Sequence, residues 1–241
     1  MKLYGNNSVI ERLKSSPQSV KKIYIQEAHR DLSYIRKKAD KWGIPLLLVP
    51  LSKIMKLARS TSTQGILVEI DDFEYAPFSD LCDDAAHHKL TLIFLDGIMD
   101  PQNLGVILRS LACLGRFGVV LPTHHSVSVT EAVLRVACGG ENFVRVAQVS
   151  NLGAAIDQAK EEGIQIAGTV ITGGSDLSRT RLDFPLALVI GSEHKGVREV
   201  ILKKLDVLLT IPMTIDRMSL NVAQAVTIFA YEINRQKTVR K

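Results

Sequence analysis

The first residues that could do chemistry follow a buried-strand pattern that ends at Asp96. An Asp-Pro turn comes next, and a helix is predicted to begin near Asn103, with an apolar stripe that leaves Arg109 on its polar side. An arginine near the carboxyl end of a strand can reach a phosphate in the crevice where open α/β sheets bind ligands. The same spacing fits a surface cation at Arg109 and a helix cap at Asn103, so the residues alone leave both interpretations open.

A second group follows the strand pattern of residues 186–190. Gly191 and Gly196 have the spacing of the two glycines of a phosphate-binding P-loop, but Val197 stands where the lysine of that loop belongs. No Gly-x-Gly-x-x-Gly follows a strand either, so nucleotide triphosphatases and dinucleotide enzymes are both disfavoured. Glu193 either accepts hydrogen bonds from a ligand or caps the next helix.

The third group lies between residues 209 and 232. Ser219 suits a helix N-cap, and Asn221 fits a structural amide. The helix predicted after them is apolar on almost every side. Such a helix must be buried, either in its own domain or against a partner subunit.

The elements that must position these groups form two α/β units. In the first, short strands alternate with helices, and an acidic, proline-interrupted linker with a short helix follows it. In the second, strands buried on both faces alternate with helices, which indicates a mostly parallel sheet. The predicted strands are 22–26, 46–49, 65–70, 90–95, 117–121, 144–149, 164–170, 186–190 and 207–211, and the predicted helices include 30–42, 51–58, 103–114, 151–162 and 197–205.

Charge is divided unevenly along the 241 residues, whose net charge is +5. Residues 1–68 contain 13 Lys and Arg against 4 acidic residues, whereas residues 69–88 contain 7 acidic residues and no Lys or Arg. A basic N-terminal unit suits a phosphate-binding surface, because neutralising phosphates supplies most non-specific nucleic-acid affinity. For the run 36–38 taken alone, a solvated helix face is the better explanation.

Several other classes of protein are disfavoured. The three cysteines are far apart and form no Cys-x-x-Cys pair, so neither a disulfide framework nor a zinc site is expected. No apolar run reaches the length of a signal peptide or a bilayer-spanning helix. We therefore expect a cytoplasmic protein with no membrane and no metal among its partners.

Taken together, the three groups resemble the three signature motifs of the SpoU (TrmH-like) branch of the SPOUT RNA methyltransferases. The segment from Asp100 to Arg109 is similar to the first motif, that from Ile190 to Gly196 to the second, and that from Ile211 to Val222 to the third. Their order and their position at predicted strand ends make the resemblance specific.

This resemblance implies an α/β fold in two parts. The C-terminal part, residues 90–241, is expected to be a trefoil-knotted SPOUT domain with a mostly parallel sheet. Residues 1–70 resemble the RNA substrate-binding domain often fused ahead of it, a small α/β domain similar to a ribosomal protein. Residues 71–89 would be the linker.

The resemblance also implies the reaction: transfer of a methyl group from S-adenosylmethionine to a ribose 2′-hydroxyl of structured RNA, by a homodimer. Ribosomal RNA, at a 23S guanosine-type site, is the first expectation; the alternatives are transfer RNA and a catalytically silent RNA-binding or ribosome-assembly protein. Because arginine stays protonated at neutral pH, Arg109 is interpreted as a phosphate ligand that stabilises alkoxide charge, not as a base. The implied catalytic residues are Asn103, Arg109, Glu193, Ser219 and Asn221, and the implied cofactor-binding residues are Thr169, Gly191, Ile211, Met213, Ser219 and Leu220.

Overall fold

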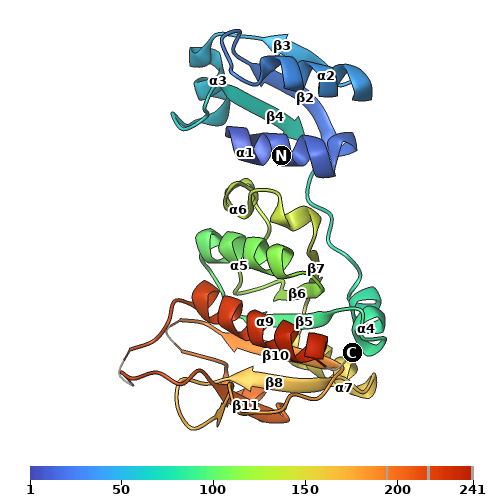
Figure 1. Cartoon of the computed structure of the whole chain (residues 1–241), viewed down its shortest axis with the longest axis vertical. Coiled ribbons are helices and arrows are strands. Elements are labelled where there is room, and N and C mark those ends of the chain that lie inside the picture. The colour runs from blue at the N-terminus through green and yellow to red at the C-terminus, as the bar shows by residue number, and fades with distance from the viewer. Residues whose placement is uncertain (194, 216–217, 240–241) are drawn as a thin grey trace.

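The computed structural model describes residues 1–193, 195–215 and 218–239. Two sheets lie along the long axis of the molecule, a four-stranded one near the N-terminus and a seven-stranded one in the rest of the chain (Figure 1). An extended segment, residues 71–77, runs between them.

The four-stranded sheet has the order β1-β4-β2-β3 and carries helices on both faces. Its β2–β3 pair is parallel, and its other pairs are antiparallel. Helices α1 and α2 bury Leu13 and Ile35 on one face, and α3 buries Ile54 on the other. The elements are β1 (Lys2–Tyr4), α1 (Asn6–Ser15), η1 (Pro17–Ser19), β2 (Val20–Ile25), α2 (Leu32–Trp42), β3 (Leu46–Leu48), α3 (Leu51–Ala58) and β4 (Ile66–Ile70).

The seven-stranded sheet has the order β7-β6-β5-β10-β8-β11-β9, and its strand pairs are parallel. The chain order reverses between β5 and β10, which is where open α/β sheets bind ligands. Its elements are α4 (Phe78–Ala86), β5 (Thr91–Asp96), α5 (Pro101–Leu114), β6 (Phe117–Pro122), α6 (Glu131–Ala137), η2 (Gly140–Asn142), β7 (Arg145–Val149), α7 (Leu152–Glu161), β8 (Gln165–Thr169), β9 (Ser175–Asp176), β10 (Leu186–Gly191), α8 (Glu199–Leu202), β11 (Val207–Thr210) and α9 (Val222–Val239).

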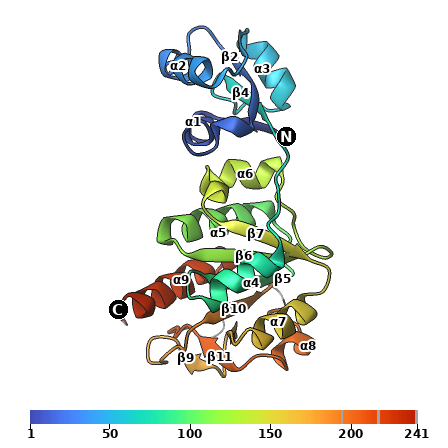
Figure 2. The same ribbon diagram turned by 90° about the vertical axis from the view of Figure 1, so that its right-hand side faces the viewer.

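Helices cover both faces of this sheet (Figure 2). Alternate side chains of β5 point to opposite faces. Ile93 and Leu95 join the apolar cluster that includes α5 and α9, whereas Leu92 and Phe94 pack with α4, α7 and α8. Strands buried on both faces explain the continuous apolar runs that predicted them.

The two sheets are joined by direct contacts between α1 and β1 on one side and α6 and η2 on the other. Arg12 on α1 forms an ion pair with Glu141 on η2, with Nη2 2.8 Å from Oε1. The Arg135 guanidinium lies 4.7 Å from the centroid of the Tyr4 ring. Apolar residues of both parts also belong to one continuous buried cluster.

The strands predicted from the sequence all form, and so do the five predicted helices, although α8 is much shorter than the range 197–205. The sequence interpretation missed β1, α1, α6 and β9. The division at residues 70 and 90 stays a prediction, and α4, which falls in the expected linker, packs its apolar side into the core of the larger sheet. Within the described ranges no helix is long and apolar enough to cross a membrane.

Candidate active site

Three loops meet at the carboxyl ends of neighbouring strands in the larger sheet. Gly191, the last residue of β10, is in register with Asp96, the last residue of β5. The first sequence motif begins at the end of the loop after β5 and continues into α5, the loop after β10 contains the second, and the segment between β11 and α9 contains the third. The parallel sheet therefore brings together segments that are about 120 residues apart in the chain, as the strand reversal requires.

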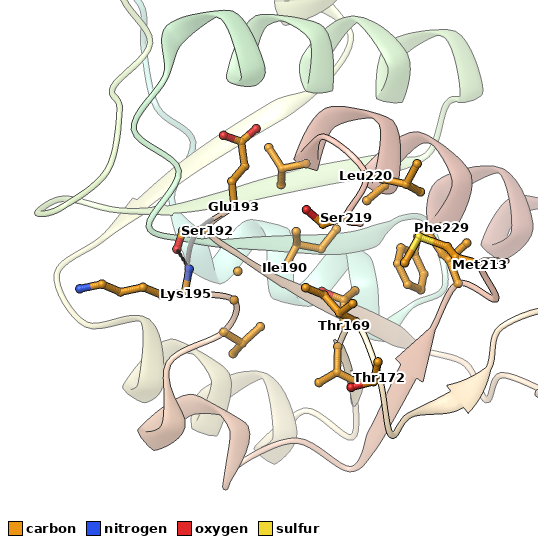
Figure 3. Close-up of a pocket in the computed structure, with 18 of the residues that line it drawn as sticks. Thr169, Thr172, Ile190, Ser192, Glu193, Lys195, Met213, Ser219, Leu220 and Phe229 are labelled. Atoms are coloured by element: carbon orange, nitrogen blue, oxygen red, sulfur yellow. Dashed lines mark hydrogen bonds between the residues drawn. The ribbon is translucent and has the colours of Figure 1, made fainter. Parts of the chain in front are cut away.

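The loops after β8 and β10 and the segment between β11 and α9 line a cavity of about 380 Å³. Its walls are mainly apolar, with a few hydroxyl and backbone groups, which is typical of a site for a small organic ligand. Figure 3 shows Glu193 at one end of the cavity, Met213 and Phe229 at the other, and Ser219 between them. All six residues expected to bind the cofactor line this cavity: Thr169, Gly191, Ile211, Met213, Ser219 and Leu220.

Close backbone packing shapes one wall of the cavity. Ser192 and Gly196 exchange two backbone hydrogen bonds, of 3.1 and 2.9 Å, which hold these two residues against each other. A Cβ atom on Gly191 would lie 1.9 Å from the carbonyl carbon of Gly196. Only glycine leaves room for this contact, so the spacing that resembled a P-loop serves a close approach of two backbone segments.

A buried carboxylate holds the far end of the same loop. The Asp96 side chain is 1% exposed, and its Oδ1 accepts a hydrogen bond of 2.7 Å from Nε of Arg198. The backbone N–H of Arg198 donates to Oδ2 at 3.0 Å. A charge-assisted pair of this kind fixes the loop more firmly than neutral hydrogen bonds would. The sequence interpretation missed Arg198; the signal available was an aspartate at the end of a buried strand, which requires a cationic or N–H partner.

Three of the expected catalytic residues form one hydrogen-bonded group, which we call the amide–carboxylate cluster: Asn103, Glu193 and Asn221. Oε1 of Glu193 accepts from Nδ2 of Asn103 at 3.0 Å and from Nδ2 of Asn221 at 2.8 Å. Nδ2 of Asn221 also lies 3.0 Å from Oδ1 of Asn103. Asn103 is buried, whereas Glu193 and Asn221 are exposed, so the cluster has one anchored member and two that solvent or a substrate can reach.

The helix caps differ from the sequence expectation. Helix α5 begins at Pro101, and the Asp100 side chain accepts from the backbone N–H of Gln102 at 2.8 Å, so Asp100 and not Asn103 is its cap. At α9 the cap is Asn221, whose Oδ1 accepts from the backbone N–H of Ala223 at 2.9 Å. The expected cap, Ser219, lies two residues too early and lines the cavity instead.

Arg109 lies apart from the amide–carboxylate cluster. It is exposed on α5 and borders a different cavity, of about 440 Å³, between α1 and the larger sheet. No described residue forms a hydrogen bond or ion pair with its guanidinium. The backbone of α5 at Arg109 packs closely against Gly140, where a Cβ would lie 2.8 Å from the Arg109 Cα. In a single chain Glu193 and Ser219 line the cavity, Asn103 and Asn221 are hydrogen-bonded to Glu193, and Arg109 lies on another surface.

Comparison with known families identifies the family to which a chain with this cavity belongs. The model of the SpoU rRNA Methylase family matches residues 90–231, which contain the cavity and all three loops. The chain belongs to this family. A second model, described as RNA 2′-O ribose methyltransferase substrate binding, matches residues 2–76. The chain is therefore an RNA methyltransferase by family, and the expected donor, S-adenosylmethionine, is confirmed at that level.

Relatives of this SpoU chain extend over nearly its full length. A Staphylococcus haemolyticus protein named as a TrmH family tRNA/rRNA methyltransferase is 34% identical over 239 residues, covering 98% of this chain and 95% of its own. The protein named YacO in Bacillus subtilis, given the same family, is 32% identical over 237 residues, 97% of this chain and 94% of its own.

Solved structures show the same fold. The SpoU methyltransferase AviRb from Streptomyces viridochromogenes, in complex with AdoMet, superimposes with a TM-score of 0.81 at 20% identity, covering 99% of this chain and 90% of its own. An AdoMet-bound rRNA methyltransferase from Sinorhizobium meliloti gives 0.80 at 21% identity, with coverage of 97% and 86%. The expected SPOUT fold is confirmed. Among the described residues there is no group of three or more His, Cys, Asp or Glu side chains placed to hold a metal ion.

Proposed function

We propose that this protein transfers a methyl group from S-adenosylmethionine to a ribose 2′-hydroxyl of ribosomal RNA, at a 23S guanosine-type site. The observation that carries this proposal is the amide–carboxylate cluster, whose Glu193 lines one end of the cavity, in a chain of the SpoU family. The family description names rRNA, and the relatives' names leave both rRNA and tRNA open.

The cavity suits the proposed donor. Its apolar walls, which include Ile190, Ile211 and Phe229, can bury an adenine ring, while backbone groups beside Thr169 and Leu220 can hydrogen-bond its edge and the amino-acid portion. When bound, S-adenosylmethionine supplies a methyl group that is already electrophilic. The chain then has to position the acceptor hydroxyl and raise its nucleophilicity.

The amide–carboxylate cluster fits the positioning task. Both amides donate to Oε1 of Glu193, and no hydrogen bond from the described residues reaches its Oε2. That oxygen remains available to accept a hydrogen bond from a ribose hydroxyl or from a cation that approaches with the RNA. Asn103 and Asn221 keep the carboxylate in one orientation, because each is fixed in turn, Asn103 by burial and Asn221 by its role as the α9 cap.

Arg109 is proposed to bind the phosphate of the target nucleotide and to stabilise the alkoxide as it forms. Its exposure and freedom from internal partners suit an external anion. Val106, one helical turn before it, is 41% exposed, and Ile228 and Tyr231 on the adjacent α9 are 39% and 61% exposed. We propose that this apolar surface of α5 and α9 forms the homodimer interface, which would place Arg109 at the subunit boundary.

The test is methyl transfer from labelled S-adenosylmethionine to ribosomal RNA and, in parallel, to transfer RNA, followed by digestion to nucleosides. The proposal predicts a 2′-O-methylated nucleoside from ribosomal RNA and none from transfer RNA. A methyl label on a base contradicts the proposed reaction. Label in transfer RNA alone contradicts the proposed substrate. If neither RNA is labelled, the result supports a catalytically silent RNA-binding protein. Arg109→Lys should remain slow at raised pH, because a point charge cannot replace the bidentate fork, and full recovery of the rate contradicts the phosphate-binding role.

A further inference from the structure

Helix α2 carries an exposed band of aromatic and basic residues at the end of the molecule far from the cavity (Figures 1 and 2). We call it the α2 stripe, and it consists of Tyr34, Lys37, Lys38, Lys41 and Trp42. These positions have the spacing i, i+3, i+4, i+7 and i+8, which places them along one side of a helix. The Tyr34 and Trp42 side chains are 38% and 48% exposed.

The helix is firmly docked, so the stripe is a fixed surface. Ile35 and Ala39, on the side of α2 next to the stripe, are 0% and 1% exposed and belong to the core of the small sheet. Gly43 ends the helix in a left-handed conformation, with φ of 64°. The backbone that presents the stripe is therefore held by packing and by a C-cap.

The cations of the stripe lack acidic partners. No ion pair joins Lys37, Lys38 or Lys41 to a described residue, and the Nζ of Lys38 lies 5.9 Å from the centroid of the Tyr34 ring. Asp40, the acidic residue within α2, projects from a different side of the helix, at 100° per residue. The stripe thus offers positive charge and two partly exposed aromatic rings without internal neutralisation.

That combination fits unpaired RNA. Base–aromatic stacking needs a base whose face is free, and lysines beside the rings neutralise the phosphates that connect such bases. Bases inside an A-form duplex are stacked on one another and offer no free face, so a duplex would engage only the charges. The remaining occupant to consider is a second copy of this chain, because Leu47 and Leu48 on the edge strand β3 are 38% and 44% exposed.

We propose that the α2 stripe binds unpaired nucleotides of the substrate RNA by stacking them on Trp42 and Tyr34. The inference rests on the proposed function in one respect, that the substrate is RNA, but it assigns this contact to a surface separate from the methyl-transfer cavity. Charge complementarity decides between the occupants, because a like-charged second copy would place lysines of two stripes against each other.

The chain offers a direct probe, because Trp42 is its single tryptophan. We expect a single-stranded oligouridylate of about 12 nucleotides to quench the Trp42 emission of the full-length protein in a saturable way, and less so as salt rises. A duplex RNA of the same length should not quench it. Equal quenching by the duplex, or a change in emission with protein concentration in the absence of RNA, overturns the proposal.

Variants separate stacking from charge, with binding followed by the polarisation of a labelled oligouridylate. Trp42→Ala should weaken binding about tenfold to a hundredfold, and Trp42→Phe should restore most of it. Lys37→Gln with Lys41→Gln should reduce the salt dependence, whereas Lys53→Gln with Lys56→Gln makes the same charge change on α3, on the opposite face of the sheet.

Equal effects of the two lysine pairs, or unchanged binding by Trp42→Ala, refute the α2 stripe as the site. Methyl transfer is measured separately on the same variants. Loss of Trp42 quenching with RNA methylation intact refutes only the stacking inference. Trp42 quenching without any methyl transfer refutes only the proposed reaction.

Discussion

The buried ion pair between α1 and η2 gives a quantitative prediction about the junction of the two sheets. The Arg12 and Glu141 side chains are 9% and 1% exposed. Burial lowers the pKa of Arg12 and raises the pKa of Glu141, and in both cases the partner's charge only partly opposes this effect. Desolvation therefore dominates the pair, and Arg12 is the main group that keeps the Glu141 carboxylate ionised.

In Arg12→Met, the carboxyl of Glu141 is expected to remain buried by taking up a proton. Its ordinary pKa is 4.5. Protonation at pH 7 then costs about 1.4 kcal/mol for each of the roughly 2.5 pH units between these values, or about 3.5 kcal/mol of unfolding free energy. A carboxyl whose folded-state pKa is raised stabilises the fold below its unfolded pKa, and that contribution is lost as pH rises toward the folded pKa.

The matched variant Arg12→Met with Glu141→Gln removes the titrating group and keeps its shape. We expect urea unfolding to show it about 3.5 kcal/mol more stable than Arg12→Met at about pH 7, with the difference falling to near zero by about pH 4.5. As a control, Lys21→Met removes the exposed Lys21–Asp71 pair and should leave the free energy of unfolding nearly unchanged. A difference below about 1 kcal/mol at neutral pH, or one that does not vary with pH, refutes the reasoning.

Three further changes test the site and the C-terminal helix. Gly191→Ala should abolish S-adenosylmethionine binding in calorimetry, because the added Cβ would lie 1.9 Å from a backbone atom. The control Gly153→Ala on α7, whose Cβ would have its nearest contact at 3.3 Å, should bind S-adenosylmethionine normally. Equal binding by the two variants contradicts the packing argument. Asp96→Asn should raise the KM for S-adenosylmethionine about tenfold with kcat little changed, because it weakens the charge-assisted contact between Asp96 and Arg198. The control Asp157→Asn, at the exposed pair with Lys204, should leave the KM unchanged. A fall in kcat alone argues against a role of Asp96 in positioning the loop. Burial lowers the pKa of Lys237 to about 8 from 10.5, so its stabilising contribution is present above pH 10.5 and lost as pH falls through 8. Lys237→Met should therefore raise the thermal midpoint of unfolding at neutral pH. A gain in the midpoint that persists at pH 10.5 contradicts this cause.

Much of the larger sheet could be predicted because its strands are buried on both faces. Such strands give continuous apolar runs, and β5, β6 and β10 show them clearly. Helix α1 gave no such signal. Its buried positions include Asn6, Ser8 and Arg12, which are polar residues whose burial depends on partners far away in the chain. From its composition alone, such a segment is predicted to be exposed to solvent.

The site was predictable in its membership but not in its geometry. Resemblance indicated Asn103, Glu193 and Asn221, yet nothing local to these residues shows that they share one carboxylate oxygen, because the contacts span 90 and 118 residues. The apolar pattern of α9 left two alternatives, burial in its own domain or against a partner subunit; in the single chain Ile228 and Tyr231 on its outer side are exposed, so burial of that side stays a prediction. A hydrophobic pattern shows that a helix needs apolar neighbours, and it cannot say whether they belong to the same chain.

Ribose methylation by this SpoU protein is tested most directly by a transcript-wide map of 2′-O-methylated nucleotides in cells with and without it. We predict that one ribose methyl of ribosomal RNA disappears when the protein is absent and returns with the wild-type chain, but not with Gly191→Ala. If every ribose methyl persists without the protein, or a base methyl is lost in its place, the proposed ribose methylation is refuted.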